Sequence, residues 1–119
     1  MNIKQVFKEN PEGFSIDLSN MTLSDYKNGY IVAITDNMTD SSMIEGLFKN
    51  LLNASLYINV PEYKKVIGGW RDEQTKMFYL DLSVWVETRE EAISLCKSFN
   101  QKAYYDCKEQ EALSFEEVL

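Results

Sequence analysis

The segment FYLDLSVWVE, residues 78–87, constrains the fold more than any other part of the chain. Its apolar residues recur at every second position, which is the period of a strand with one buried face. The buried positions are Phe78, Leu80, Leu82, Val84 and Val86, and the outward positions are Met77, Tyr79, Asp81, Ser83, Trp85 and Glu87. The pattern therefore predicts a long strand that separates a core from a free face.

The stretch KKVIGGWR, residues 64–71, predicts a second strand that pairs with the first. The two strands flank DEQTK, residues 72–76, a polar loop of hairpin length. With this five-residue loop, Trp70 pairs with Phe78 and points into the core. A loop shorter by one residue moves Trp70 to the outward face beside Tyr79, because neighbouring residues of a strand face opposite sides. The sequence leaves both registers open.

Two neighbouring glycines, Gly68 and Gly69, lie inside this second strand. A phosphate-binding loop would lead from a strand into a helix N-terminus, whereas this pair leads into another strand. Glycine within a strand instead marks a bulge, a bend or a place where a large side chain crosses the backbone. In the five-residue register Gly69 faces Tyr79 and Gly68 faces Leu80, so an aromatic ring covers a bare glycine. We interpret the pair as part of the scaffold.

The N-terminal half predicts a short helix, two strands and a longer helix. Asp40 or Ser41 is expected to cap the longer helix. Gly46 inside it costs about 1 kcal/mol of helix propensity, which we attribute to close approach of a neighbouring backbone. After this helix, Pro61 limits any strand to a sheet edge. The segments are residues 3–9, 13–19 and 30–35, then a helix with the apolar stripe Met43, Ile44, Leu47, Phe48, Leu51 and Leu52.

The C-terminal third predicts a capped helix and further strands. Thr88 and Glu91 have the spacing of a capping box. KAYYDC, residues 102–107, predicts a strand, and ALSF, residues 112–115, a short last strand. The buried stripe of the helix is Ala92, Ile93, Leu95, Cys96 and Phe99.

This order of elements predicts an α+β fold. Two strand pairs are each followed by an amphipathic helix, which suggests loosely repeated ββα units. The economical arrangement is two layers, a mainly antiparallel sheet with two to three helices packed on one face. The length of 119 residues suits one domain, residues 1–119.

Composition excludes several functions. The chain has no histidine, so it contains no Ser-His-Asp or Cys-His catalytic set and no histidine-based zinc site. With 19 acids against 12 bases, its net charge of −7 disfavours direct nucleic-acid binding. Cys96 and Cys107 lack metal-ligand and Cys-x-x-Cys spacing, and we expect Cys96 in the core and Cys107 near the surface. No pattern indicates a metal or a cofactor.

The outward face of strand 78–87 is the candidate functional surface. Tyr79, Asp81 and Trp85 lie on it, and Tyr104 and Trp70 are further candidates. Trp and Tyr dominate protein-binding hot spots, so aromatic rings among carboxylates indicate a protein-binding patch. A helix or a second copy of the chain that covers this face would explain the same residues.

Carboxylate chemistry is an alternative use of these strands. Asp81 and Asp106 both lie on predicted strands, and paired carboxylates can serve as general acid and base. Acids on the surface of a strand are usually only solvated. We therefore expect no enzyme activity.

The runs IGGWRDEQTKMFYLDLS, TREEAISLCKSFNQ and KAYYDC together resemble a module of small acidic proteins from phages and other mobile elements. The resemblance covers roughly Val66 to Cys107. Some proteins of this kind are anti-CRISPR or other anti-defence inhibitors. It implies a non-catalytic inhibitor or adaptor that binds a host protein, with CRISPR effectors among the candidates. The negative charge favours binding in a basic nucleic-acid channel of that partner, where dispersed carboxylates would substitute for phosphates. No functional residue carries over.

Two other functions fit the same residues. The chain could be a structural or accessory phage protein that forms a homodimer through the outward face, or a small carboxylate-dependent enzyme. No apolar run is long enough for a signal peptide or a membrane span. We therefore expect the cytoplasm of the bacterial host, with no membrane partner.

Overall fold

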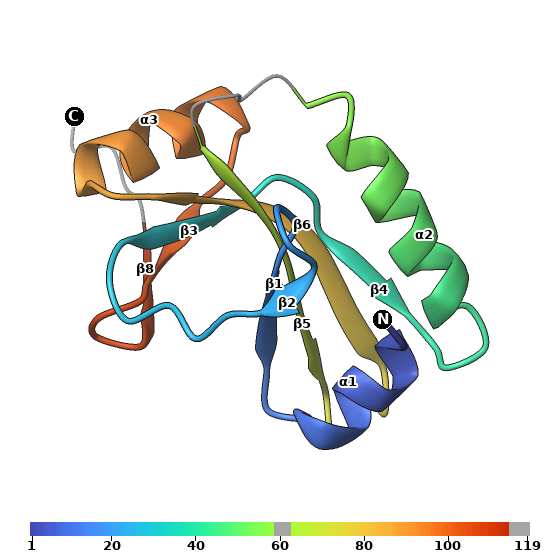
Figure 1. The fold of residues 1–119 in the computed structure, drawn as a ribbon. Helices are drawn as coiled ribbons and strands as arrows, with labels where there is room; N and C mark the ends of the chain where they lie inside the picture. The colour runs from blue at the N-terminus through green and yellow to red at the C-terminus, as the bar shows by residue number, and fades with distance from the viewer. Residues whose placement is uncertain (59–62, 115–119) are drawn as a thin grey trace.

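The computed structural model describes residues 1–58 and 63–114, which form three helices and an eight-stranded antiparallel sheet (Figure 1). The helices are α1 (Ile3–Glu9), α2 (Ile44–Ser55) and α3 (Arg89–Ser98). The strands are β1 (Phe14–Asp17), β2 (Thr22–Leu23), β3 (Tyr30–Ala33), β4 (Asn37–Thr39), β5 (Lys64–Arg71), β6 (Phe78–Val86), β7 (Ala103–Asp106) and β8 (Glu111–Ser114). The predicted α+β fold is confirmed, and Pro61 lies outside the described residues.

Strand β6 is the centre of the sheet. β5 pairs with one edge of β6, and β1 and β2 extend the sheet beyond β5. On the other edge β3 pairs with one end of β6 and β4 with the other end, and β7 and β8 extend the sheet beyond β3. The consecutive strands β2 and β3 thus lie on opposite sides of the β5–β6 pair. The segment between them, residues 24–29, has to cross the sheet (Figure 1).

β3 and β4 form one interrupted strand along β6. Ala33 pairs with Ser83 and Asn37 with Leu80. The chain therefore advances four residues from β3 to β4 while it advances three residues along β6. This is a one-residue bulge, which bends the strand and turns backbone groups away from the ladder. The Leu82 carbonyl accepts hydrogen bonds from two amides of the bulged segment.

All three helices cover the same face of the sheet. α1 and α2 pack over β1, β5 and one half of β6, and α3 packs over β3, β7 and the other half. The predicted inward positions of β6 all lie on this face. The buried residues are Ile3, Val6, Phe7, Ile16, Ile44, Phe48, Leu51, Ile67, Leu80 and Leu82 in one cluster, and Val32, Val84, Val86, Ala92, Leu95, Cys96 and Tyr104 in the other.

The start of α3 follows the prediction, and the start of α2 does not. The Thr88 hydroxyl accepts a hydrogen bond from the Glu91 amide at 3.2 Å, and the Glu91 carboxylate accepts one from the Thr88 amide at 3.2 Å. No side chain in the described part of the chain caps the start of α2. The prediction of a cap at Asp40 or Ser41 was wrong, because the Asp40 carboxylate instead accepts from the amide and hydroxyl of Ser42 in the preceding turn.

Gly46 lies on the exposed side of α2. A Cβ atom built on it would have no described atom within 4 Å apart from its own helix backbone. Its attribution to a closely packed backbone was therefore wrong, and nothing in the described residues requires glycine at this position.

The β5–β6 hairpin has a six-residue loop, residues 72–77, so both predicted loops, the five-residue one and the one shorter by a residue, were too short. The Asp72 carboxylate accepts a hydrogen bond from the Gln74 amide at 2.9 Å, and Lys76 adopts a left-handed conformation with φ 64°. The extra residue changes the register, because neighbouring strand residues face opposite sides. Trp70 therefore pairs with Tyr79 and points away from the helices, so the register that placed it in the core was wrong.

The two glycines of β5 serve opposite faces of the sheet. Gly69 faces Leu80, not Tyr79, and the ring that covers it belongs to Phe14 of β1. Gly68 faces Asp81 on the other side, and of the residues that the structure describes a Cβ there would meet only a backbone oxygen, at 3.7 Å. The predicted aromatic cover exists, but a different strand supplies it.

Candidate functional site

The sheet face opposite the helices, here termed the open face, carries most of the predicted binding residues. Trp70 of β5 and Tyr79, Asp81 and Trp85 of β6 alternate with residues of the core clusters and so point to the open face. Within residues 1–58 and 63–114 no helix packs on this side. The pairing thus brings four of the five candidate side chains to one surface.

Trp70 and Tyr79 form a stacked aromatic pair. They are direct cross-strand partners, their ring centroids lie 4.5 Å apart, and the two planes are nearly parallel, at 7°. Trp70 remains 44% exposed. An exposed indole that is held in place by a second ring loses little conformational entropy on binding, which is the property of a hot-spot residue.

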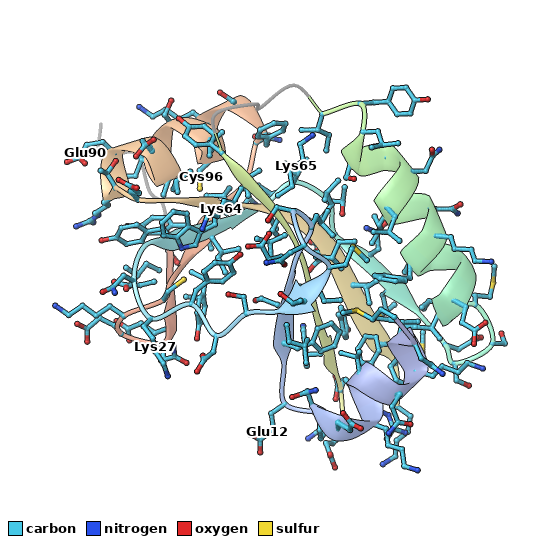
Figure 2. All side chains as sticks on the ribbon, viewed as in Figure 1. Glu12, Lys27, Lys64, Lys65, Glu90 and Cys96 are labelled. Carbon is cyan, nitrogen blue, oxygen red and sulfur yellow. The ribbon has the colours of Figure 1, made fainter. Side chains whose placement is uncertain are left out.

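Trp85 has a different role, because the crossing segment covers it. Tyr26 stacks on its ring at 5.8 Å, and the indole N–H donates a hydrogen bond to the Asn28 carbonyl at 2.9 Å. The ammonium group of Lys64 lies 5.3 Å from the ring centroid (Figure 2). Gly29, at φ +82°, passes so close that a Cβ would lie 2.5 Å from the ring. Trp85 therefore anchors the chain's own loop.

A groove of about 690 Å³ lies on the open face, bordered by Trp70 at one end and by the crossing segment at the other. Its volume is within the usual range of ligand sites in proteins. Gly68, Asp81 and Ser83 lie on the strands at its base, and Tyr26 and Tyr105 line it farther along. The groove is larger than the hollow of about 300 Å³ beside α1 and α2.

The charges of the groove have one sign. Glu12, Asp25 and Asp81 are the acids among the described residues that line it, and no lysine or arginine is in that set. Asp25 forms an exposed ion pair with Lys27 at 2.7 Å, and Glu12 lies in the turn between α1 and β1 (Figure 2). The groove therefore favours a positively charged ligand.

Asp81 owes its position to the bulge between β3 and β4. The bulge leaves the Asn37 amide free to donate a hydrogen bond of 2.9 Å to Oδ1 of Asp81. Burial raises the pKa of Asp81 to about 6, and the nearby Asp36 carboxylate adds to the rise, although the Asn37 hydrogen bond opposes it. A carboxylate with a raised pKa gains more than an ordinary one from a cationic partner.

Tyr104 lies on the opposite side of the sheet from the other candidates. It is 3% exposed in the core under α3, and its hydroxyl accepts a hydrogen bond from the Arg89 guanidinium at 2.8 Å. Its place among the surface candidates was wrong. Tyr105, the next residue, points to the open face and lines the groove. Positions 104 and 105 are both tyrosine, so the residue types do not show which of them faces the core. Strand alternation could have identified Tyr105 only if the orientation of one residue of β7 had been known.

Asp106 and Cys107 both take part in hydrogen bonds of the β7–β8 turn. The Asp106 carboxylate accepts hydrogen bonds from the amides of Lys108 and Glu109, at 3.0 and 3.1 Å, and so closes the β7–β8 turn. Cys107 is 1% exposed, and burial followed by the charge of Asp106 raises its pKa to about 11. The prediction of a more exposed Cys107 was wrong, since the turn folds back on the crossing segment. Cys96 lies in the core, as predicted.

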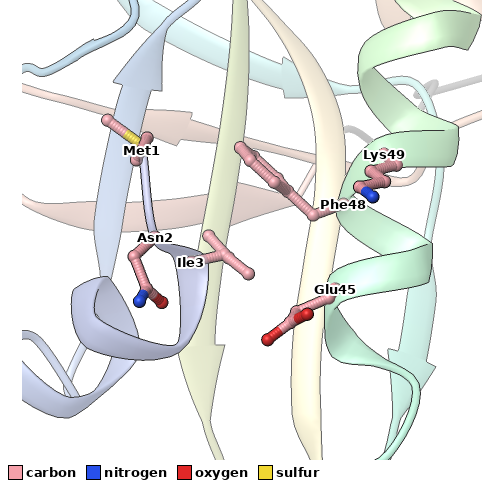
Figure 3. A pocket seen from close by; sticks show the side chains of 6 residues that line it. All are labelled: Met1, Asn2, Ile3, Glu45, Phe48 and Lys49. Atoms are coloured by element: carbon pink, nitrogen blue, oxygen red, sulfur yellow. The ribbon is translucent and has the colours of Figure 1, made fainter.

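A second hollow, of about 300 Å³, lies between the N-terminus of α1 and the side of α2 (Figure 3). Its charged members are Glu45 and Lys49 of the exposed helix surface, and Lys4 pairs with Glu45 at 3.7 Å. The charged groups of Lys4 and Glu45 are exposed to solvent, so they do not form a site at which charges converge on one bound atom. In the described part of the chain, no cluster of three or more Cys, Asp or Glu side chains could hold a metal ion.

Comparisons with protein-family models, curated proteins and solved structures found no match to this chain. Within the described residues, none of the helices has the length and apolar character needed to cross a membrane. The geometry of the groove is therefore the main evidence on function.

Proposed function

We propose that this protein is a non-catalytic binding protein that acts by stoichiometric contact with a host protein through the open-face groove. The observation that carries the proposal is the groove itself, with the stacked Trp70–Tyr79 pair beside the Asp81 carboxylate. Exposed aromatic rings next to a polar anchor are the usual composition of a binding hot spot.

The biological role that we propose is inhibition or adaptation of a host protein by a protein of phage or mobile-element origin, with anti-CRISPR activity included. The resemblance of residues 66–107 supports this role. The net charge of −7 supports a partner with a basic surface, such as the nucleic-acid channel of a host effector. Contact with that channel would prevent nucleic acid from entering it.

Capture of the partner tests the proposal. The tagged protein is incubated with a lysate of the bacterial host, and bound proteins are identified by mass spectrometry. Trp70→Ala is compared with Tyr57→Ala, which removes an 80% exposed aromatic ring beyond the end of α2. We expect one partner that Trp70→Ala loses and Tyr57→Ala keeps. A partner retained equally by both variants would refute the groove as the binding site.

A carboxylate-dependent enzyme is a second candidate, because Asp81 has a raised pKa inside a groove. The two functions differ in stoichiometry. An inhibitor abolishes the partner's activity linearly up to one equivalent, whereas an enzyme at a tenth of an equivalent inactivates all of the partner with time. Titration of the captured partner with the protein, followed at two incubation times, distinguishes them.

Self-association through the same face is a third candidate, which the exposed Trp70 favours. A single chain has a mass of 13.8 kDa. Size-exclusion chromatography with light scattering therefore separates the alternatives. A mass twice this value that Trp70→Ala halves would assign the open face to a homodimer.

A further inference from the structure

We propose that the groove accepts an arginine side chain of the partner, with the guanidinium lying over Gly68, its edge toward the Asp81 carboxylate and its plane against the Trp70 indole. The inference rests on the proposed function and specifies the chemistry of the partner. It is supported by three features of the groove: space at the base, an incompletely bonded carboxylate and a fixed ring.

The space comes from the sequence of residues along β5. Trp70 and Tyr79 form one cross-strand row on the open face, and Gly68 and Asp81 form the next row, two residues along each strand. Because Gly68 has no side chain, bare backbone lies directly beside the carboxylate. Among the described residues, a Cβ added there would have only the Phe14 carbonyl oxygen within 4 Å, at 3.7 Å, so these residues leave the space above Gly68 open. A flat group can therefore lie between the ring and the acid.

The carboxylate of Asp81 has unused hydrogen-bonding capacity. Among the described residues it accepts one hydrogen bond, from the Asn37 amide to Oδ1, and a carboxylate can accept about four. Its charge is not balanced by a base of this chain in the groove, because none of the described residues that line it is lysine or arginine. A guanidinium supplies both the missing charge and two parallel N–H donors.

The ring of Trp70 supplies the third contact. Tyr79 supports one face of the indole at a centroid distance of 4.5 Å, and the side chain remains 44% exposed. A cation over such a ring is attracted by its π-electrons, most strongly for tryptophan. The fixed orientation favours a planar cation that stacks.

These contacts favour arginine over lysine. A guanidinium is planar and weakly hydrated, so its plane can stack on a ring while its edge points to the carboxylate. An ammonium group keeps a strong hydration shell and presents no flat surface. Lysine would still be attracted by the acids, but it would use the carboxylate without the ring and the Gly68 surface.

The test is an NMR titration of the ¹⁵N-labelled full chain with three acetylated and amidated pentapeptides, Gly-Ser-X-Ser-Gly, in which X is arginine, lysine or citrulline. Citrulline keeps the shape of arginine and removes its charge. We expect the arginine peptide to bind with a dissociation constant of the order of 1 mM and to shift the amides of residues 68–70 and 79–83. Citrulline should bind at least about tenfold more weakly.

Two variants and one control assign the contacts. Asp81→Asn should weaken arginine binding about tenfold or more, because it removes the charge and one acceptor. Gly68→Ala places a methyl group in the open space above this backbone position and leaves every charge unchanged. It should therefore weaken arginine binding and keep the native NMR spectrum. Glu90→Gln on α3 removes one exposed charge away from the groove and should bind as the unmodified protein does (Figure 2).

The outcomes separate this inference from the proposed function. Equal binding of arginine and citrulline peptides, shifts outside the groove, or no shift at about 10 mM peptide would overturn the arginine assignment. Equal binding of arginine and lysine would replace it with a general cation site. If Trp70→Ala still loses the captured partner, the proposed function stands without the arginine assignment. If capture is independent of the groove, the proposed function fails whatever the peptides do.

Discussion

Phe14 lies directly over Gly69, so closely that a Cβ built on the glycine would lie 2.5 Å from Cζ of the ring. Phe7 packs edge-on against the same ring, with the centroids 4.8 Å apart, which leaves Phe14 little room to move. The neighbouring Gly68 has no such contact. Adjacent residues of identical type are therefore under different constraints.

Alanine at these two positions should have opposite effects on stability. Gly69→Ala overpacks the core and should lower the free energy of unfolding by about 1–3 kcal/mol. Gly68→Ala fits the open space and reduces the freedom of the unfolded chain, so stability should stay equal or rise by about 0.5 kcal/mol. Urea denaturation followed by circular dichroism measures both. Equal losses at the two sites would contradict the register of β1 on β5.

Gly29→Ala should loosen the crossing segment. The position needs φ +82°, and a Cβ there would meet the Trp85 ring at 2.5 Å. We expect a loss of about 2–4 kcal/mol from strain and overpacking. The control is Gly46→Ala on the exposed side of α2, which should raise stability by about 0.5–1 kcal/mol. Urea denaturation of each variant checks the result, and a neutral Gly29→Ala would show that the segment does not contact Trp85.

The raised pKa of Asp81, about 6, predicts a pH-dependent stability. The folded protein binds this proton more tightly than the unfolded chain, so ionisation of Asp81 costs stability as pH rises from about 4 to 6. Asp81→Asn removes that cost, and Asn37 can still donate to the amide oxygen. The variant should gain of the order of 1 kcal/mol over the unmodified protein at pH 7, after allowance for the carboxyl's solvent contact, and little at pH 4.

Denaturation of the two proteins side by side at both pH values isolates Asp81, since all other titrating groups are common to them. Asp36 is present in both proteins, and its effect on the pKa of Asp81 is part of the measured difference in stability. A stability difference that is constant with pH would place the carboxyl in ordinary solvent.

Both cysteines should resist thiol reagents in the folded protein. Cys96 and Cys107 are buried, and burial raises the pKa of each thiol, so little reactive thiolate is present. Reaction with Ellman's reagent at pH 8 should be at least about a hundredfold slower than in urea, because it requires opening of the structure. Rapid release of one equivalent from the native protein would contradict the burial of Cys107.

The architecture follows from sequence patterns that act over short distances. The alternation in residues 78–87 defines both faces of β6, and the Thr88–Glu91 spacing defines the start of α3. The hairpin register was not predictable in the same way. It depends on one extra residue in the loop, with Lys76 at a positive φ, and Asp72 was the available signal of a side-chain-closed turn.

The site depended on contacts between distant segments, which no local pattern reports. Trp70, Tyr79 and Asp81 could be placed on one face from strand alternation once the register was known. The cover on Trp85 could not, because it comes from a loop about 57 positions earlier in the chain. Tyr104 and Tyr105 are identical in type, so only the pairing of β7 with β3 shows which of them faces the groove.

Because residues 24–29 cross the sheet, β1 and β3 lie on opposite sides of the β5–β6 pair, and both are synthesised before it. The inner neighbour of β1 is β5, and the inner neighbour of β3 is β6. Both early strands therefore lack these neighbours until much more of the chain has been synthesised. Pairing between strands that are distant in sequence slows folding and leaves strand edges exposed until the partner strand is present. A nascent chain that stops before Phe78 therefore lacks β6, the central strand with which β5, β3 and β4 pair.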